Sequence, residues 1–439
     1  MCTGTGCAPP PVLTGTRLTP TSTRLSWTFP ATTATSFELE RSVDGVSFGP
    51  VSQPAGSDRQ FDDSMQVRGT RYWYRVRAIT SAGPQGWSNV VQIDGAPAAG
   101  NNTWRTLGGD IGHTGYNALE QGRPPLSLRW TAFTTSVDPV VADGDRVYAV
   151  TNRLLTALDA ADGGVSWTHP FPSVFSVGQP AVFDGQVYVA HCNHSSDTKL
   201  WSLDPQTGNT TWSVAMSAQW EKYWAPIKVG SGVYTNGGSY GGLYGFDAMS
   251  GANLFFNSML AQVDEWSPAS DGNLLYTFVG GVFRAHHPQT GATQWQTSVA
   301  PGLASPVIAN GMAWVIVPPN LHAIDLSTHT IRWTASGLNF TGTPAVANGV
   351  VYAVSAGNVR AHNATTGAFL WTFVGDGALR YPPVLTQTHL YASSTSQVFA
   401  ADLATHASVW NAPGGGWLSV ANGSLYVAGT GLRAYSLTP

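Results

Sequence analysis

Residues 143–167, DGDRVYAVTNRLLTALDAADGGVSW, contain the pattern that decides the fold of this 439-residue chain. The segment has a strand-like run around Tyr148, a second run that ends at Asp159, and a turn followed by Trp167. An aromatic residue equivalent to the first of these returns every 35 to 46 residues: Tyr148, Tyr188, Tyr234, Tyr276, Trp314, Tyr352, Tyr391 and Tyr426. A fixed period of this size indicates a repeat architecture.

A second pattern is tighter, because a polar residue is followed eight positions later by an aromatic residue in seven repeats. The pairs are Asp159/Trp167, Asp204/Trp212, Asp247/Phe255, His287/Trp295, Asp325/Trp333, Asn363/Trp371 and Asp402/Trp410. Four positions before the aromatic residue lies a Gly or a His, which fits a turn position with positive φ. The connection is too short for a crossover helix, so we expect antiparallel pairing of the strands on either side.

Each repeat therefore predicts four antiparallel strands, the content of one β-propeller blade. The eighth repeat reaches Pro439 before its last strand. The run from Leu126 to Ala132, with Trp130 in the position of the repeat Trp, looks like the missing strand. We expect an all-β chain in which residues 126–439 form an eight-bladed β-propeller closed by an N-terminal strand.

The repeat resembles that of the quinoprotein-like family of PQQ-type propellers, whose units read Gly-x-Val-Tyr-Val and then Leu-x-Ala-Leu-Asp-x-x-Thr-Gly-x-x-x-Trp. The segment from Trp104 to Gly115 also looks like the one that opens many members. In that family the Trp residues dock between neighbouring blades. The resemblance assigns this structural role to Trp130, Trp167, Trp212, Trp295, Trp333, Trp371 and Trp410.

Residues 10–95 predict a separate β domain. The run from Tyr72 to Ala78 alternates between two faces, as a half-buried antiparallel strand does. With Trp27 in an early strand, the segment resembles a fibronectin type III domain, which implies a β-sandwich that spaces or presents its neighbour. We expect a tail over residues 1–9 and a linker and lead-in over residues 96–125.

Composition excludes several classes of protein. Hydrophobic residues make up 43% and charged residues 10% of the chain, which excludes charge-driven disorder. The net charge of −4 provides no basic field for nucleic acid, and no apolar run is long enough to span a membrane. No signal peptide is visible, yet the domain content favours an extracellular or cell-envelope location. In an oxidising compartment Cys2 and Cys7 could form a disulfide.

The resemblance raises the question of quinone chemistry. The quinone-dependent enzymes of this kind carry an adjacent Cys-Cys pair beside the cofactor, and this chain has none. Its three Cys residues are Cys2, Cys7 and Cys192. We therefore expect no cofactor, with PQQ and Ca²⁺ as the less favoured alternative. The segment from His191 to Asp197 has metal-binding residue types but loose spacing, so we expect a polar loop rather than a metal site.

One face of the propeller stands out as a binding surface. Two residues before the Pro that opens each innermost strand, or before Ser419 in the eighth repeat, the position is aromatic in four repeats: Trp224, Trp266, Tyr381 and Trp417. Polar and charged neighbours are Glu265, Glu221, Arg380 and Tyr240. These residues form either an aromatic rim at the mouth of the central channel, which could stack a glycan or a peptide, or a plug of rings packed on one another.

We interpret the chain as a non-catalytic binding or scaffold protein that recognises a protein or glycan partner at the propeller mouth. One alternative is an enzyme, either a quinone-dependent dehydrogenase or a glycan-active enzyme that uses Glu265, Asp264 or Glu221. Another alternative is a structural subunit of a surface assembly, with contacts through the N-terminal domain.

Overall fold

The computed structural model describes residues 9–19, 22–29, 34–64, 72–93, 102–193, 198–217, 222–237, 241–258 and 265–437. All regular secondary structure in these ranges is β-strand. The described ranges contain no helix of the length and apolarity that crossing a membrane requires. The chain divides into two compact units, residues 1–100 and 101–439.

The first unit contains two antiparallel sheets with one shared core. One sheet has the order β1-β2-β5, and the other has the order β4-β3-β6-β7 with β8 also paired to β6. Buried side chains of both sheets meet in this core, including Leu25 and Trp27 from one and Phe37, Leu39 and Tyr74 from the other. The strands are β1 (Val12–Thr19), β2 (Ser22–Thr28), β3 (Ala34–Ser42), β4 (Gly49–Ser52), β5 (Gln60–Asp63), β6 (Tyr72–Thr80), β7 (Gly83–Pro84) and β8 (Val91–Ile93).

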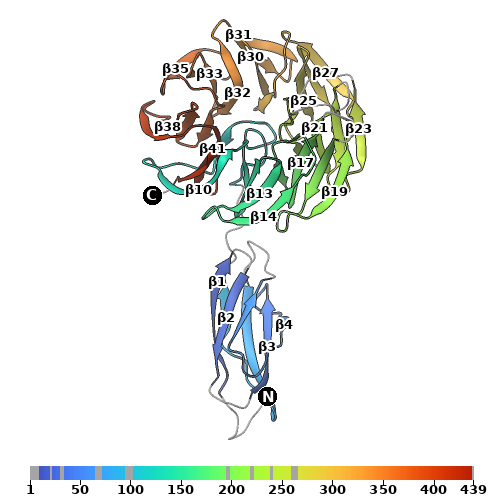
Figure 1. Ribbon diagram of the computed structural model, residues 1–439, viewed down its shortest axis with the longest axis vertical. Coiled ribbons are helices and arrows are strands. Elements are labelled where there is room, and N and C mark those ends of the chain that lie inside the picture. The colour runs from blue at the N-terminus through green and yellow to red at the C-terminus, as the bar shows by residue number, and fades with distance from the viewer. Residues whose placement is uncertain are drawn as a thin grey trace. The chain divides into compact units, whose positions relative to one another are not determined.

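The second unit is a β-propeller whose sheets are arranged around a centre (Figure 1). Within the described residues its strands form eight sheets, and six of them follow the chain directly as four or five consecutive antiparallel strands. These six are β11–β14, β15–β19, β20–β23, β24–β27, β28–β31 and β32–β35. A seventh sheet has the order β39-β38-β37-β36-β9, and the eighth has the order β10-β41-β40.

The strand bounds of this unit follow the predicted repeats. In chain order they are β9 (Tyr116–Asn117), β10 (Ser127–Ser136), β11 (Val141–Asp143), β12 (Arg146–Thr151), β13 (Leu154–Asp159), β14 (Val165–Pro170), β15 (Ser176–Val177), β16 (Ala181–Phe183), β17 (Gln186–Cys192), β18 (Lys199–Leu203), β19 (Thr210–Ala215), β20 (Ile227–Val229), β21 (Gly232–Asn236), β22 (Leu243–Asp247), β23 (Asn253–Asn257), β24 (Ala269–Ser270), β25 (Leu275–Val279), β26 (Val282–His286), β27 (Thr293–Ser298), β28 (Val307–Ala309), β29 (Met312–Val317), β30 (Asn320–Asp325), β31 (Thr330–Ala335), β32 (Phe340–Ala347), β33 (Val350–Ser355), β34 (Asn358–Asn363), β35 (Phe369–Phe373), β36 (Val384–Thr386), β37 (His389–Ser393), β38 (Gln397–Asp402), β39 (Ser408–Pro413), β40 (Trp417–Ala421) and β41 (Ser424–Ser436).

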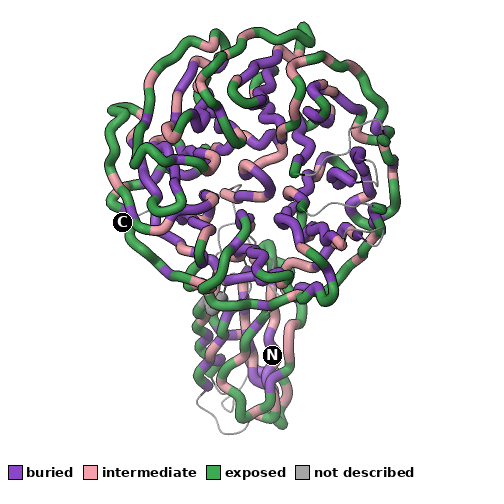
Figure 2. Tube along the Cα trace, turned by 45° about the horizontal axis from the view of Figure 1, so that its top comes forward, coloured by how far each residue is buried: buried purple, intermediate pink, exposed green. Residues whose placement is uncertain are grey.

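Burial falls from the inner to the outer strand of each sheet. In the sheet β11–β14, the second strand is buried at five of its six positions, whereas the outermost strand is buried only at Trp167. Figure 2 shows the same trend for the whole unit, with exposed residues along the outer rim. The register between the third and fourth strands shifts just after the residue paired with the repeat Trp, as between Ala157 and Leu158. The same irregularity recurs in the next six sheets.

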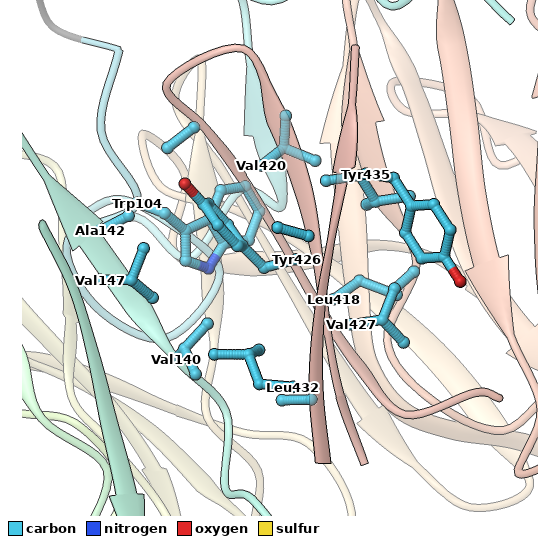
Figure 3. Close-up of a cluster of buried hydrophobic side chains, with 14 of the residues drawn as sticks. Trp104, Val140, Ala142, Val147, Leu418, Val420, Tyr426, Val427, Leu432 and Tyr435 are labelled. Atoms are coloured by element: carbon cyan, nitrogen blue, oxygen red, sulfur yellow. The ribbon is translucent and has the colours of Figure 1, made fainter. Parts of the chain in front are cut away.

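The two ends of this unit meet in one sheet. Strand β10 pairs antiparallel with β41, and Trp130 lies opposite Ala434. Side chains from β40 and β41, such as Leu418 and Tyr426, pack with Trp104 and with Val140 of the first sheet (Figure 3). Strand β10, which precedes the first sheet in the sequence, is therefore the outer strand of the last sheet, so the ring is closed by pairing of segments from its two ends.

The segment from Trp104 to Asn117, which we call the central segment, contacts every sheet of the propeller that the structure describes. Its backbone or side chains form hydrogen bonds of 2.7 or 2.8 Å with the innermost strand of each sheet or the residue just before it. The partners are Trp104–Ala142, Arg105–Val182, Thr106–Pro226, Ile111–Ser270, Gly112–Ile308, Thr114–Val346, Gly115–Leu385 and Asn117–Val420. This segment therefore ties the inner edges of the sheets together at the centre.

Candidate functional site

The repeat Trp residues lie between sheets. The Nε1–H of Trp130 donates to the carbonyl of Ala160 in the first sheet at 3.1 Å, and Trp167 donates in the same way to Pro205 of the next sheet at 2.9 Å. Trp212, Trp333 and Trp410 repeat this contact with Ala248, Ala364 and Leu126 at 3.0–3.1 Å. Each indole thus links its own sheet to the following one, as the family resemblance implies.

The turn Gly of the next sheet permits this close approach. A Cβ added at Gly163 would lie 2.7 Å from the ring of Trp130, and one added at Gly367 would lie 2.7 Å from the ring of Trp333. Where the turn carries His instead, the imidazole lies flat on the indole, as for His329 on Trp295 and His406 on Trp371. In the sheet β20–β23, Phe255 occupies the position of the repeat Trp and packs against Gly291, the turn Gly of the next sheet.

Three aromatic residues of the predicted mouth come together. Trp224 lies before β20, Trp417 opens β40 and Tyr381 lies before β36. The ring centroids of Trp224 and Trp417 are 5.3 Å apart at 62°, and those of Tyr381 and Trp417 are 5.5 Å apart at 63°. All three side chains are half-buried. Edge-to-face contacts of this kind leave part of each ring uncovered.

Trp266 differs from this group. It is fully buried and packs with Ile227, Tyr234 and Leu275 in a core between neighbouring sheets. The prediction that Trp266 lines a binding surface is therefore wrong, because its side chain is not exposed. The equivalent repeat position does not fix whether a ring turns toward the channel or into the gap between sheets, and at this position the core provides the apolar contacts.

Charged groups surround the aromatic cluster. Lys222 and Glu265 form an ion pair of 2.7 Å, and both side chains remain largely exposed. The guanidinium of Arg380 lies 5.8 Å from the ring centre of Tyr381. Partial removal of water raises the pKa of Asp138, and Lys222 opposes this shift. Glu265 has a φ of 59°, a conformation that non-glycine residues rarely adopt and that is enriched at functional sites.

Two hollows share Trp224, Trp417 and Glu265 in their lining. One of about 460 Å³ is also lined by Asp138, Gln179 and Lys222, among others. The other, of about 230 Å³, is bounded further by Leu303, Ser305, Pro318, Thr343 and neighbouring residues. The two indoles and the Glu265 side chain therefore form the boundary between the hollows.

A smaller cavity lies beside them and shares Gln179 and Trp417. Its lining includes His113, whose Nδ1 lies 3.1 Å from the carbonyl of Pro306. Since a carbonyl only accepts, Nδ1 carries the proton and Nε2 is an acceptor. Among the described residues, neither Nε2 of His113 nor Oε1 of Gln179 has a hydrogen-bond partner, although both atoms are buried. Sequence reasoning missed both residues, because neither belongs to the repeat signature or to a polar cluster in the sequence.

Several predicted residues lie outside the described ranges. These are Cys2, Cys7, Glu221, Tyr240, Asp264 and Asp197. Cys192 is buried in a core between sheets. His191 accepts a hydrogen bond from Nε1 of Trp201 at 2.8 Å, which gives it a structural contact. Within the described residues, no three His, Cys, Asp or Glu side chains come together as metal ligands.

A family model described as "Outer membrane protein assembly factor BamB" matches residues 77–264, 279–388 and 340–412. The first match begins inside the first unit, but most of the matched length lies in the propeller. No curated protein sequence matches the chain significantly.

Solved structures show the same fold at low sequence identity. BamB from Moraxella catarrhalis is 19% identical, with a TM-score of 0.58 over 71% of this chain and 99% of that one. Quinohemoprotein alcohol dehydrogenase from Comamonas testosteroni is 15% identical, with a TM-score of 0.60 over 77% and 81%. The computationally designed Ika8 protein is 12% identical, with a TM-score of 0.60 over 70% and 99%.

At these identities the structures establish the fold and leave the chemistry open. The family model covers well over half of the chain, and its matches fall on the repeats that form the sheets of the ring. The chain belongs to the family of the outer membrane protein assembly factor BamB, a family of PQQ-type repeat β-propellers.

Proposed function

We propose that this chain is a binding or scaffold protein of the cell envelope that holds a partner at the mouth of its propeller. The observation that supports this most directly is the cluster of Trp224, Trp417 and Tyr381. The half-buried rings of Trp224 and Trp417 border two hollows, and Tyr381 packs edge to face on Trp417. Aromatic anchors of this kind supply much of the binding energy of protein recognition sites.

We also propose that the ring has eight blades. Each of the eight sheets would be one blade, and the contacts of the repeat aromatic residues support this count. The first of these contacts joins Trp130 of β10, in the last sheet, to Ala160 of the first sheet. The series ends with Trp410, which donates to Leu126 just before β10. The closing pairing of β10 with β41 fits the same arrangement.

For the first unit we propose a fibronectin type III-like sandwich that spaces the propeller or presents it to a partner. The shared core between its two sheets supports this architecture. The proposed envelope location rests on the family, whose description names an outer membrane assembly factor. Assembly through the first unit, with Cys2 and Cys7 as a disulfide, remains part of this proposal.

The fold family includes quinone enzymes, so the mouth must be compared with the needs of that cofactor. PQQ carries three carboxylates, and its enzymes bind it together with Ca²⁺. Here one of the nearby cations, Lys222, is already paired with Glu265, and the chain has no adjacent Cys pair. The described residues also contain no cluster of three metal-binding side chains. These residues do not fit the cofactor, and we propose that the mouth acts without it.

The experiment that tests the function is a binding screen with the full chain. Intrinsic tryptophan fluorescence and calorimetry would follow titration with a panel of decapeptides and a panel of oligosaccharides. We expect one panel to contain a ligand whose affinity falls at least about tenfold in Trp417→Ala. The control is Phe369→Ala, which removes an aromatic side chain that is 51% exposed on the outer strand of another sheet. A ligand equally affected by both substitutions would contradict a site at the mouth.

A further inference from the structure

We propose that the ligand held at the mouth is a neutral oligosaccharide. This inference rests on the proposed function and specifies the chemistry of its partner. Three features of the site carry it, namely the form of the aromatic cluster, the supply of unused acceptors and the balance of charge.

The aromatic cluster suits sugar rings. Trp224 and Trp417 meet edge to face at 62°, and this contact leaves part of each indole uncovered. A pyranose has one face made mainly of C–H groups, which stacks on an indole face and needs no deep pocket. Because both indoles border both hollows, a chain of several sugar units can pass from one hollow to the other across the rings.

Two buried acceptors lie near the rings. Gln179 lines the larger hollow and is 4% exposed, and its Oε1 has no partner among the described residues. His113 is fully buried in the lining of the smaller cavity, which shares Gln179 and Trp417 with that hollow, and its Nε2 is a second acceptor without a partner in the described part of the chain. Carboxylates of Asp138 and Glu265 line the hollows beside them. Sugar hydroxyls provide donors that rotate to suit such acceptors, and a site with unpaired buried acceptors discriminates strongly for ligands that supply them.

The local charge favours a neutral ligand. The Lys222 ammonium lies 2.7 Å from the Glu265 carboxylate, so the strongest cation at the hollows is already neutralised. An anionic glycan would have to compete with Glu265 and would also face Asp138. A strongly cationic peptide would find Lys222 and Arg380 beside the same rings. A neutral hydroxyl-rich chain is repelled neither by the carboxylates nor by the cations at the site.

The test uses the full chain with a β-1,4-linked glucose hexamer and an N-acetylglucosamine hexamer as probes. A panel of uncharged decapeptides serves as the comparison, and calorimetry and tryptophan fluorescence give the affinity. We expect a hexamer to bind with an affinity that changes less than about twofold between 0.05 and 0.5 M NaCl, because no ion pair forms. We expect Trp417→Ala and Gln179→Leu each to weaken this binding about tenfold, and Phe369→Ala to leave it unchanged.

Thermal melts of each variant check that the fold is retained, and Trp224→Ala replaces Trp417→Ala if the latter does not fold. Peptide binding that depends on Trp417, without binding of either hexamer, would overturn the sugar inference and leave the proposed function standing. Binding of neither class would count against both. Hexamer binding that is insensitive to both mouth substitutions would place the site elsewhere and overturn the inference.

Discussion

The imidazole of His329 lies flat on the indole of Trp295, with ring centroids 4.1 Å apart and planes 13° from parallel. His406 makes the same contact with Trp371 at 4.2 Å and 11°. Both His residues occupy the turn position that is Gly in most repeats, and both keep its positive φ, 59° and 60°. At these two turns the backbone is therefore strained, and the His side chain stacks on the indole of the neighbouring sheet.

This relationship predicts different outcomes for two substitutions at residue 329. His329→Ala removes the stacked ring and retains a Cβ in the left-handed conformation, whereas His329→Gly removes the ring and also relieves the strain. We expect the Ala variant to lose about 1–2 kcal/mol of unfolding free energy and the Gly variant to be about 1 kcal/mol more stable than it. Urea denaturation measures both. Equal stability of the two variants would show that the backbone strain is negligible.

Docking of the repeat Trp residues predicts a large effect of Trp333→Ala. The substitution removes a hydrogen bond to Ala364 and the packing of the indole over Gly367. Because the side chain is half-buried, we expect a loss of about 2–4 kcal/mol, in the lower range for buried aromatic residues. Phe369→Ala, on the neighbouring sheet, should cost less than about 1 kcal/mol. An unchanged urea midpoint for Trp333→Ala would refute the docking role.

Burial of Trp266 predicts that this residue stabilises the fold instead of contacting ligand. Trp266→Ala would leave a cavity among Ile227, Tyr234 and Leu275, and we expect a loss of about 3–5 kcal/mol. Trp224→Ala should lose much less stability, since its ring is half-exposed in the channel. Differential scanning calorimetry of the two variants gives the comparison. Similar melting temperatures for both would contradict the different positions of these rings.

The central segment predicts a steric effect at Gly115. An added Cβ there would lie 2.6 Å from the Cβ of Ala345, and the residue has a φ of 66°. Gly311 has a comparable φ of 74° with no atom within 4 Å of an added Cβ, so Gly311→Ala measures the conformational cost alone. We expect Gly115→Ala to destabilise the chain by at least about 1 kcal/mol more than Gly311→Ala. Equal losses of unfolding free energy in the two variants would mean that the central segment shifts to accommodate the added Cβ at no energetic cost.

Two buried His residues predict a dependence of stability on pH. Burial lowers the pKa of His113 to about 4 and that of His286 to about 4. In the unfolded chain His has a pKa near 6.5, so below this pH the unfolded state binds protons that the folded state excludes. The free energy of unfolding should fall as the pH drops from about 6.5 to about 4, by at most about 1.4 kcal/mol per unit for each His.

Urea denaturation at pH 7.0, 5.5 and 4.5 measures this slope. His286→Gln removes one of the two groups and should make the decline shallower, whatever its effect on stability at pH 7. His287 is exposed beside it and provides the control. The interpretation fails if His286→Gln and His287→Gln show the same slope as the unaltered chain.

The sequence was sufficient to predict the propeller because each repeat carries its own signals. The eight-residue offset between Asp159 and Trp167 fixes the turn between two strands, and the aromatic residue docks on the next sheet through the Gly of the equivalent turn. The predicted contribution of Trp130 to the last sheet also follows from its local similarity to the Trp333 strand. These interactions are short-range within a repeat or between adjacent repeats, so they leave a periodic pattern.

The details of the candidate site could not be predicted in the same way. Trp224 and Trp266 occupy the same position in their repeats, yet one ring faces the channel and the other fills a gap between sheets. Gln179 lines the larger hollow from the entry to β16, whereas His113 reaches the adjoining smaller cavity from the central segment. Their neighbours come from distant parts of the chain, and no local pattern encodes such contacts.

The central segment has a mechanical consequence. The central segment, at the N-terminal end of the propeller unit, bonds to all eight of its described sheets. A pull on the first unit therefore reaches the ring at its hub, where the tension is divided among many hydrogen bonds loaded side by side. Peeling away one outer strand would require far less force. This arrangement makes the propeller resist unfolding when its N-terminal end is pulled.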